Sequence, residues 1–328
     1  MLTKIKISKN LIVSFLPSAT EILYEIGAGS RIIGVTHECN YPKEAKSKPR
    51  VINSSFDAST MSSKEIDNKI VELFSNGKDI YIVNDEILKE LKPDLIVAQG
   101  ICKVCSPFSK EIKRAISILG YNPKVIVLDP HTVSDILDNI NEIATNIGKI
   151  KEGKRLVRVL EAKINRIQKI SELKVNKENL PKIICLEWIE PFFTAGHWVP
   201  EMVEIAGGIN GLSKPKEQSR RASIEEIKKF DPDKIILMPC GFNIDRTIKE
   251  YQNTTTTLNE NQEWNNLRAI KNNELYVVDA GSYFSKPGPR TITGIEILAK
   301  IISPNEFKHI TIPENSYSKL ITNDLTNN

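Results

Sequence analysis

Residues 133–173 read VSDILDNINEIATNIGKIKEGKRLVRVLEAKINRIQKISEL, and no strand pattern interrupts them. Their apolar side chains recur at helical spacing in two sets, which are separated by Gly148 and Gly153. The two sets are Ile136, Leu137, Ile140, Ile143, Ala144 and Ile147, and then Leu156, Val159, Leu160, Ile164, Ile167 and Ile170. We predict a short helix and then one of about 22 residues, on the order of 33 Å long, which is enough to cross between two domains.

On both sides of this helical segment, patterns typical of strands and of helices alternate. Apolar runs of strand length fall at residues 11–16, 31–36, 94–99 and 124–128, and again at 182–188, 234–238 and 274–278. Helical patterns such as 18–26, 109–119 and 223–230 lie between them and begin with serines that can cap a helix. This alternation predicts an α/β protein with parallel sheets covered by helices.

The two flanks also resemble each other in sequence. The stretch EILYEIG at residues 21–27 is similar to EMVEIAG at residues 201–207, and PDLIV at 93–97 is similar to PDKII at 232–236. We predict two Rossmann-like α/β lobes joined by a long backbone helix, with a ligand cleft between the lobes. The predicted boundaries are 1–132 for the N-terminal lobe, 133–178 for the linking helices, 179–312 for the C-terminal lobe and 313–328 for a flexible tail.

Composition narrows the function classes. The 328 residues are 40% hydrophobic and 26% charged, as in an ordinary globular protein that buries a full core. Lys and Arg number 45 against 41 Asp and Glu, and the net charge of +4 is spread in mixed-sign runs. A nucleic-acid binder would concentrate basic residues in one stripe, so we expect no nucleic-acid partner. No run of 18 apolar residues is present, so we also expect no membrane-spanning segment.

The N-terminal residues and the cysteines suggest a compartment. Residues 1–10 alternate Lys with apolar residues, and only six apolar-rich residues follow before Pro17, which is too few for a secretory signal. No lipobox is seen either. Five cysteines in a chain without a leader indicate a reducing compartment. We therefore expect a cytoplasmic protein.

Unusual side chains follow the predicted strands. In open parallel sheets, ligands bind beyond the carboxyl ends of the strands. Aromatic faces there suit a large flat ligand, although packing in the core is the alternative role for each ring. Arg290, on a Pro-Gly-Pro loop, can meet a carboxylate or phosphate, or form a surface ion pair. The candidate ligand-binding residues are Trp188, Glu190, His197, Trp198, Phe242, Phe284 and Arg290.

A second group of residues has the chemistry of metal ligands. Cys102 and Cys105 have the CxxC spacing that suits zinc, an iron–sulfur cluster or a redox pair. Such a site needs further ligands, and His37, Cys39 and Cys240 are the candidates. Unligated thiols that line a pocket are the alternative. The sequence has no P-loop, no GxGxxG after the first strand, no serine nucleophile elbow and no HExxH, so no motif indicates catalysis.

Several stretches resemble a known family. SFLPSATEIL at residues 14–23, LKPDLI at 91–96, and GHWVPEM at 196–202 followed by AGG at 206–208 are similar to signatures of the helical-backbone (class III) solute-binding proteins. These are periplasmic receptors for vitamin B12, ferric siderophores and haem that serve ABC importers. The resemblance covers residues 11–303. It is strongest to cobalamin-binding members, and more narrowly to leaderless ones that carry His37-Glu38-Cys39 and Gln99-x-x-Cys102-x-x-Cys105.

This resemblance implies the predicted fold and a non-catalytic binding function. The implied ligand is cobalamin, another corrinoid or a related metal chelate, and the implied partner is an ABC transporter permease if the chain is exported. The alternative hypothesis is a cytosolic metalloprotein or enzyme, with a zinc or iron–sulfur site built from the Cys and His residues in the cleft between the lobes.

Overall fold

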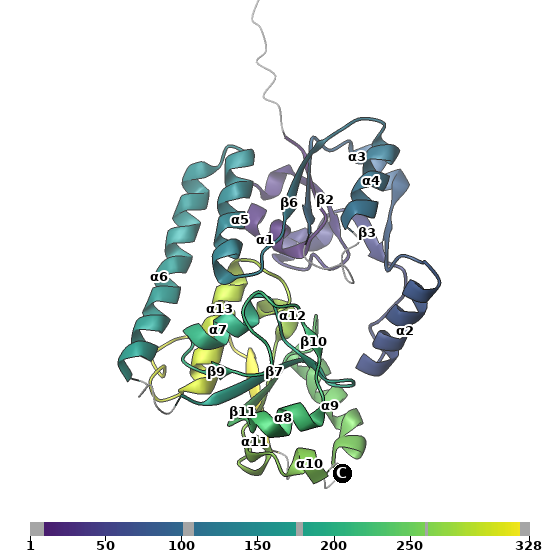
Figure 1. Ribbon diagram of the computed structural model, residues 1–328. Helices are drawn as coiled ribbons and strands as arrows, with labels where there is room; N and C mark the ends of the chain where they lie inside the picture. Colours follow the sequence, from purple (N-terminus) through teal and green to yellow (C-terminus); the bar gives the residue numbers. More distant parts are fainter. Residues whose placement is uncertain (1–9, 101–107, 175–179, 260–261, 322–328) are drawn as a thin grey trace, which may run out of the picture. The chain divides into compact units, whose positions relative to one another are not determined.

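The computed structural model describes residues 10–100, 108–174, 180–259 and 262–321. The chain packs into two units, which we call unit 1 and unit 2. Unit 1 takes up the chain to Ala58 together with Ile70–Asp129 and Asp138–Val157, and unit 2 takes up Ser59–Lys69, Pro130–Leu137 and the chain from Arg158 onward. Each unit has a sheet with parallel strands at its centre and helices against it, so the predicted two-lobe α/β fold is confirmed (Figure 1).

Unit 1 is built on a six-stranded sheet in the order β4-β3-β2-β1-β5-β6. Neighbouring strands are parallel except β3 and β4. The central β1 is buried on both faces, which explains its continuous apolar sequence. The strands are β1 (Ile12–Ser14), β2 (Ile32–Thr36), β3 (Arg50–Ser54), β4 (Tyr81–Val83), β5 (Leu95–Gln99) and β6 (Lys124–Leu128).

Local signals set the helix ends in unit 1. Pro17 occupies the first turn of α1 (Pro17–Glu25), where its missing N–H costs nothing. The Asn84 side chain accepts a hydrogen bond from the Ile87 N–H and so caps α3 (Asp85–Leu91). The other helical segments are the 3-10 turns η1 (Gly29–Arg31) and η2 (Lys43–Ser47), α4 (Phe108–Leu119), and α2 (Ser63–Ser75), which begins in unit 2.

Unit 2 is built on a seven-stranded sheet in the order β10-β8-β7-β11-β12-β13, with β9 paired to β7. The strands β7, β11 and β12 form its parallel centre, and antiparallel strands complete both sides. The strands are β7 (Lys182–Trp188), β8 (Phe193–Thr194), β9 (Ile209–Asn210), β10 (Arg220–Arg221), β11 (Lys234–Leu237), β12 (Leu275–Val278) and β13 (Tyr317–Leu320).

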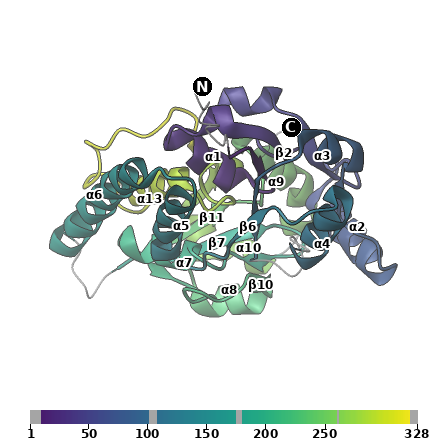
Figure 2. The same ribbon diagram turned by 90° about the horizontal axis from the view of Figure 1, so that it is seen from above.

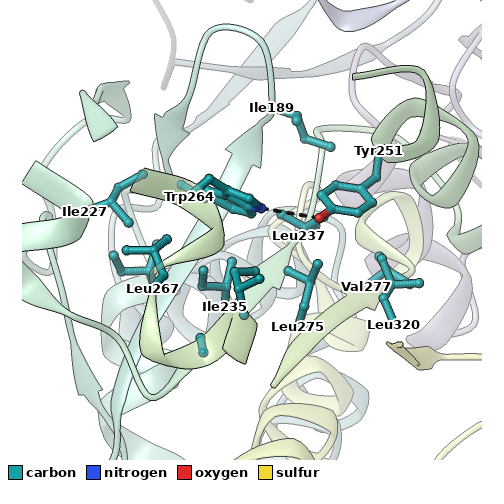
Figure 3. Packing of buried hydrophobic residues seen from close by; sticks show 14 residues of the cluster. Ile189, Ile227, Ile235, Leu237, Tyr251, Trp264, Leu267, Leu275, Val277 and Leu320 are labelled. Atoms are coloured by element: carbon teal, nitrogen blue, oxygen red, sulfur yellow. Dashed lines mark hydrogen bonds between the residues drawn. The ribbon is translucent and has the colours of Figure 1, made fainter. Parts of the chain in front are cut away.

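The alternation of side chains along β7 places helices on both faces of this sheet. Ile184 and Leu186 belong to a buried cluster with Tyr251 and Trp264, where the Trp264 indole N–H donates to the Tyr251 hydroxyl at 3.3 Å (Figure 3). That face is covered by α8 (Ile224–Phe230), α9 (Ile244–Asn259), α10 (Gln262–Asn265) and α11 (Arg268–Lys271). On the opposite face, beside Ile183, lie α7 (Val199–Ile205) and α13 (Pro289–Ile302). The short α12 (Ala280–Tyr283) follows β12.

The two consecutive helices predicted for residues 133–173 are confirmed as α5 (Val133–Asn146) and α6 (Ile150–Lys174). Gly148 lies between them with φ +73°, the left-handed conformation in which many helices end. At Gly153 a Cβ atom would lie 2.4 Å from the Ala144 Cβ, so the glycine permits close packing of the two helices. They run side by side in both views (Figures 1 and 2).

Two polar segments are more ordered than predicted. The prediction of a flexible tail is wrong for Tyr317–Leu320, because these residues pair with β12 as β13 and Leu320 joins the core cluster. The polar, low-complexity composition of residues 254–261 indicates a loop, but this stretch begins within α9, where the Thr254 hydroxyl donates to the Glu250 carbonyl at 2.7 Å. Both segments are polar, so no apolar pattern in the sequence indicates a strand or a helix there. Among the described residues, none of the helices combines the length and the hydropathy that a membrane crossing requires.

Candidate ligand-binding site

The carboxyl ends of β7, β11 and β12 meet at one edge of the sheet in unit 2, where parallel sheets bind their ligands. Trp188 ends β7, and Glu190 follows it. Phe242 follows β11, and Phe284 follows β12 and α12. All seven predicted ligand-binding residues belong to unit 2, although the first and the last, Trp188 and Arg290, are 102 positions apart.

Three of these loops are joined by hydrogen bonds and ring contacts. The ring centroids of Trp188 and Phe242 are 5.7 Å apart. The Phe242 carbonyl accepts a hydrogen bond from the Gly281 N–H at 2.9 Å, and the Ser285 hydroxyl accepts one from the Gly241 N–H at 3.0 Å. The loops that follow β7, β11 and β12 thus form one continuous surface.

Trp198 connects this surface to α7. Its indole N–H donates to the Phe284 carbonyl at 2.9 Å, and its ring lies 5.6 Å from the His197 ring. His197 has φ +56°, and its N–H donates to the Glu217 carbonyl at 2.6 Å, which fixes the direction of its side chain. We call the four rings of Trp188, Phe242, Phe284 and Trp198 the aromatic row.

Burial separates the members of the aromatic row into two kinds. Phe242, Phe284 and Trp198 are only 3%, 2% and 6% exposed, so these rings mainly hold the loops together. The alternative role of core packing therefore fits these three rings. Trp188 is half-buried and, of the four, offers the most ring surface to a ligand.

Charged side chains border the aromatic row. The Lys64 ammonium lies 2.8 Å from the Glu190 carboxylate. The Arg290 guanidinium lies over the Tyr283 ring, 5.9 Å from its centroid. The sequence analysis missed Tyr283, although it directly precedes the predicted Phe284.

Arg246 is a second residue that the sequence analysis missed. Its guanidinium lies 3.7 Å from the centroid of the Phe242 ring, close enough for a strong cation–π contact. It lies one helical turn beyond Phe242 at the start of α9, and this spacing was the only signal that could have indicated it.

The loop before α5 also contributes to unit 2 beside His197. The His131 ring lies 5.7 Å from the His197 ring. One oxygen of the Asp135 carboxylate accepts hydrogen bonds from the N–H groups of His131 and Thr132, each at 2.9 Å. Burial opposes the ionisation of Asp135, but these N–H donors and the Thr132 hydroxyl outweigh it, so the pKa of Asp135 is lowered.

Among the described residues of unit 1, the predicted metal ligands His37 and Cys39 are not grouped as a metal site. His37 and Cys39 both follow β2, but the Cys39 sulfur is fully buried and lies 3.1 Å from the Thr20 hydroxyl and 3.3 Å from the Thr36 hydroxyl. The His37 ring lies instead 5.8 Å from the Tyr81 ring.

The other predicted metal ligands give no support either. Cys240 is exposed in unit 2, and Cys102 and Cys105 lie outside the described residues. Across residues 10–100, 108–174, 180–259 and 262–321, no three or more His, Cys, Asp or Glu side chains are grouped as metal ligands. The expected zinc or iron–sulfur site, and with it the metalloprotein alternative, is therefore not supported. Two of the cysteines, Cys39 and Cys185, are simply small core side chains.

Comparison with known proteins yields relatives along most of the chain. One from Bacillus subtilis (strain 168), described as the uncharacterized ABC transporter substrate-binding lipoprotein YvrC, is 26% identical over 308 residues, or 93% of this chain and 83% of the relative. A vitamin B12-binding protein of Vibrio vulnificus (strain CMCP6) is 25% identical over 296 residues, or 87% of each chain. The solved structure of the periplasmic heme-binding protein RhuT from Roseiflexus sp. RS-1 in apo form has a TM-score of 0.66 at 19% identity, covering 90% of this chain and 99% of that chain.

The cytoplasmic location expected from the sequence is wrong. The family whose model matches the chain consists of periplasmic binding proteins, and a relative is described as a lipoprotein, so both point to a location outside the cytoplasm. The expectation rested partly on the presence of five cysteines. Burial explains the thiol of Cys185 without any reducing compartment, because desolvation raises its pKa and keeps it protonated and unreactive.

The family model itself covers most of the chain. It is described as periplasmic binding protein and matches residues 12–281, which include the whole sheet of unit 1 and most of the sheet of unit 2. The two α/β units, the long α6 and this match agree with one another. The chain belongs to the periplasmic binding protein family.

Proposed function

We propose that this chain is the substrate-binding component of an ABC transporter, and that it carries a corrinoid or a related metal chelate without transforming it. Two kinds of relative support the proposal, one described as an ABC transporter substrate-binding lipoprotein and one as a vitamin B12-binding protein. The partners would be the small-molecule ligand and a transporter permease, which the protein would meet outside the cytoplasm.

The observation that carries the proposal is the aromatic row at the carboxyl edge of β7, β11 and β12. A large planar ligand gains most from ring faces that are already held in place, because little side-chain entropy is lost on binding. Trp188 is the half-buried ring of this row, Glu190 is the partly exposed charge two residues after it, and the partly exposed Arg290 lies over the ring of Tyr283, the neighbour of Phe284. Together they offer stacking and polar contacts to a chelate with amide or carboxylate side groups.

Titration of the purified protein with cyanocobalamin, followed by calorimetry and by absorption, tests the proposal. We expect saturable binding, and we expect Trp188→Ala to weaken it by at least about 1 kcal/mol because the stacking face is lost. Trp188→Phe is the matched control, since it keeps an aromatic face and should retain most of the affinity. Equal affinity of wild type and a folded Trp188→Ala protein would contradict the role of the ring.

Haemin is the second probe, because one structural relative is described as heme-binding. Binding of haemin with no binding of cyanocobalamin would keep the transporter role and change the ligand. Binding of neither compound would overturn the proposed ligand class.

A further inference from the structure

The segment Ser59–Lys69 comes from the first half of the chain but packs within unit 2. We call it the strap. It contains the start of α2, where the Ser62 hydroxyl accepts from the Glu65 N–H at 3.3 Å and the Glu65 carboxylate accepts from the Ser62 N–H at 2.8 Å. This capping box fixes where the helix begins. Contacts to residues much later in the chain fix where the strap lies.

A buried hydrogen-bond pair anchors the strap to α9. Ser63 is fully buried, and both its N–H, at 2.8 Å, and its hydroxyl donate to one carboxylate oxygen of Glu250. Glu250 is only 5% exposed, and a buried carboxylate is stable only with such donors. The positive end of the α2 dipole favours the same negative charge. The anchor therefore depends on Ser63 and Glu250 together.

Beside the anchor, the strap contacts two of the predicted ligand-binding residues, Trp188 and Glu190. The Trp188 indole N–H donates to the Ser63 carbonyl at 3.1 Å. Lys64 forms its ion pair with Glu190 at 2.8 Å. The strap thus binds the indole N–H of the half-buried Trp188 and the carboxylate of Glu190, two groups that a ligand at this site would contact.

The outer contacts of the strap are weaker. Arg221 pairs with Asp67 at 2.7 Å, with 60% of the arginine side chain exposed, and the Arg246 guanidinium donates to the Met61 carbonyl at 3.1 Å. Exposed ion pairs contribute little to stability. Release of the strap is therefore controlled by the buried anchor rather than by its charged margin.

We propose that the strap and the ligand compete for Trp188 and Glu190, so that the strap gates access to the aromatic row. The inference rests on the proposed function for the identity of the ligand. In the free protein the docked strap shields the Trp188 ring, and ligand binding requires the strap to leave. The apparent affinity then falls in proportion to the fraction of molecules with the strap released.

Amide hydrogen exchange of residues 59–69 measures the release without any ligand. Ser63→Ala removes one donor from the buried carboxylate, and we expect the strap to exchange about tenfold faster while β7 and β11 are unchanged. Glu250→Gln is a second variant that removes the charge and keeps the shape. Ser75→Ala is the matched control, because Ser75 lies at the far end of α2 and its hydroxyl donates to the Glu72 carbonyl of the same helix at 2.9 Å.

Iodide quenching reports whether the strap covers Trp188. The contribution of this ring is the difference in emission between a protein and its Trp188→Phe counterpart. Quenching should rise in Ser63→Ala relative to wild type. Equal quenching in both backgrounds, or exchange of the strap as slow as that of the core strands in every variant, overturns the proposal.

Cyanocobalamin then tests the competition. We expect Ser63→Ala to bind it more tightly than wild type, and we expect added cyanocobalamin to speed exchange of the strap. Weaker binding by Ser63→Ala, with slower exchange of the strap in the complex, would mean that the strap is part of the bound state, and would overturn gating. If cyanocobalamin binds neither protein, the proposed ligand falls, and the exchange and quenching results still decide whether the strap covers the ring.

Discussion

Tyr251 and Trp264 make a polar contact inside an apolar cluster. Both side chains are almost fully buried, and the indole N–H has the Tyr251 hydroxyl as its hydrogen-bond partner at 3.3 Å (Figure 3). Burial raises the pKa of Tyr251, so this hydroxyl stays neutral. Rings of this size fill the space between β11 and the helices α9 and α10, and the hydrogen bond sets their orientation.

Tyr251→Phe should therefore destabilise the protein by about 1 kcal/mol, because the hydrogen bond between the buried Tyr251 hydroxyl and the Trp264 indole N–H is lost. Urea unfolding followed by tryptophan emission measures the loss. Tyr121→Phe is the matched control: its hydroxyl donates to the Pro93 carbonyl at 2.8 Å, but the residue is 40% exposed and water can replace the bond. Equal losses in the two variants would contradict this account of the buried pair.

At the scale of elements, the start of α5 is held by hydrogen bonds within its own segment and by a contact with a residue much later in the chain. Thr132 and Asp135 cap the helix reciprocally, since the Thr132 hydroxyl accepts from the Asp135 N–H at 3.0 Å and the Asp135 carboxylate accepts from the Thr132 N–H. The next N–H, that of Val133, donates to the carboxylate of Glu201 on α7 at 2.7 Å. The first turn of α5, which belongs to unit 2, is thereby capped by its own sequence and held by a residue of another helix.

Asp135→Ala should lower the free energy of unfolding by about 1 kcal/mol near neutral pH, because the cap is lost. The folded pKa of Asp135 lies below its ordinary value of 3.8. The stabilisation is therefore complete above that value and disappears as the pH falls through the folded pKa. Unfolding by urea at a series of pH values should show wild type and variant converging in acid. Asp138→Ala, which removes an exposed carboxylate of the same helix, is the matched control and should change the free energy of unfolding by no more than about 0.5 kcal/mol.

Strand β13 has a polar sequence, YSKL, that does not indicate a strand. Leu320 is 6% exposed against the core cluster, whereas the next residue, Ile321, is 51% exposed. Leu320→Ala should cost about 2–3 kcal/mol, and Ile321→Ala should change stability by no more than about 0.5 kcal/mol. Denaturant unfolding compares the two. Similar small effects would mean that β13 does not contribute to the core in solution.

At the scale of the whole molecule, all three tryptophans lie in unit 2, at positions 188, 198 and 264. Tryptophan emission therefore follows the unfolding of unit 2, whereas far-ultraviolet circular dichroism follows both units. The two signals coincide only if the units unfold together. Comparing the two signals therefore shows whether a ligand stabilises unit 2 alone or both units.

A ligand that binds at the aromatic row should stabilise unit 2 by mass action. At a hundredfold excess over its Kd, cyanocobalamin should add about 2.7 kcal/mol to the free energy of unfolding measured by tryptophan emission. Trp188→Ala should reduce this gain at the same ligand concentration. A gain that is unchanged in the variant would place the ligand away from Trp188.

The sequence by itself determined the elements and their order. Apolar runs of strand length, helical patterns, capping residues such as Ser223 and the turn glycine Gly148 act within a few positions of the chain. The α/β alternation and the two consecutive helices at residues 133–173 could therefore be predicted. The family resemblance is likewise carried by short contiguous motifs. The seven candidate ligand-binding residues could be grouped because each follows a predicted strand.

Only the tertiary structure decided which of these residues are buried and which segment lies against them. Trp198, Phe242 and Phe284 look like ligand contacts in the sequence, but packing between loops buries their rings. The strap lies in unit 2 because Ser63 meets Glu250, a contact across 187 positions that no local pattern encodes. Interactions within a few residues act through backbone conformation and can be predicted from sequence, whereas burial depends on surfaces that exist only after distant segments have packed.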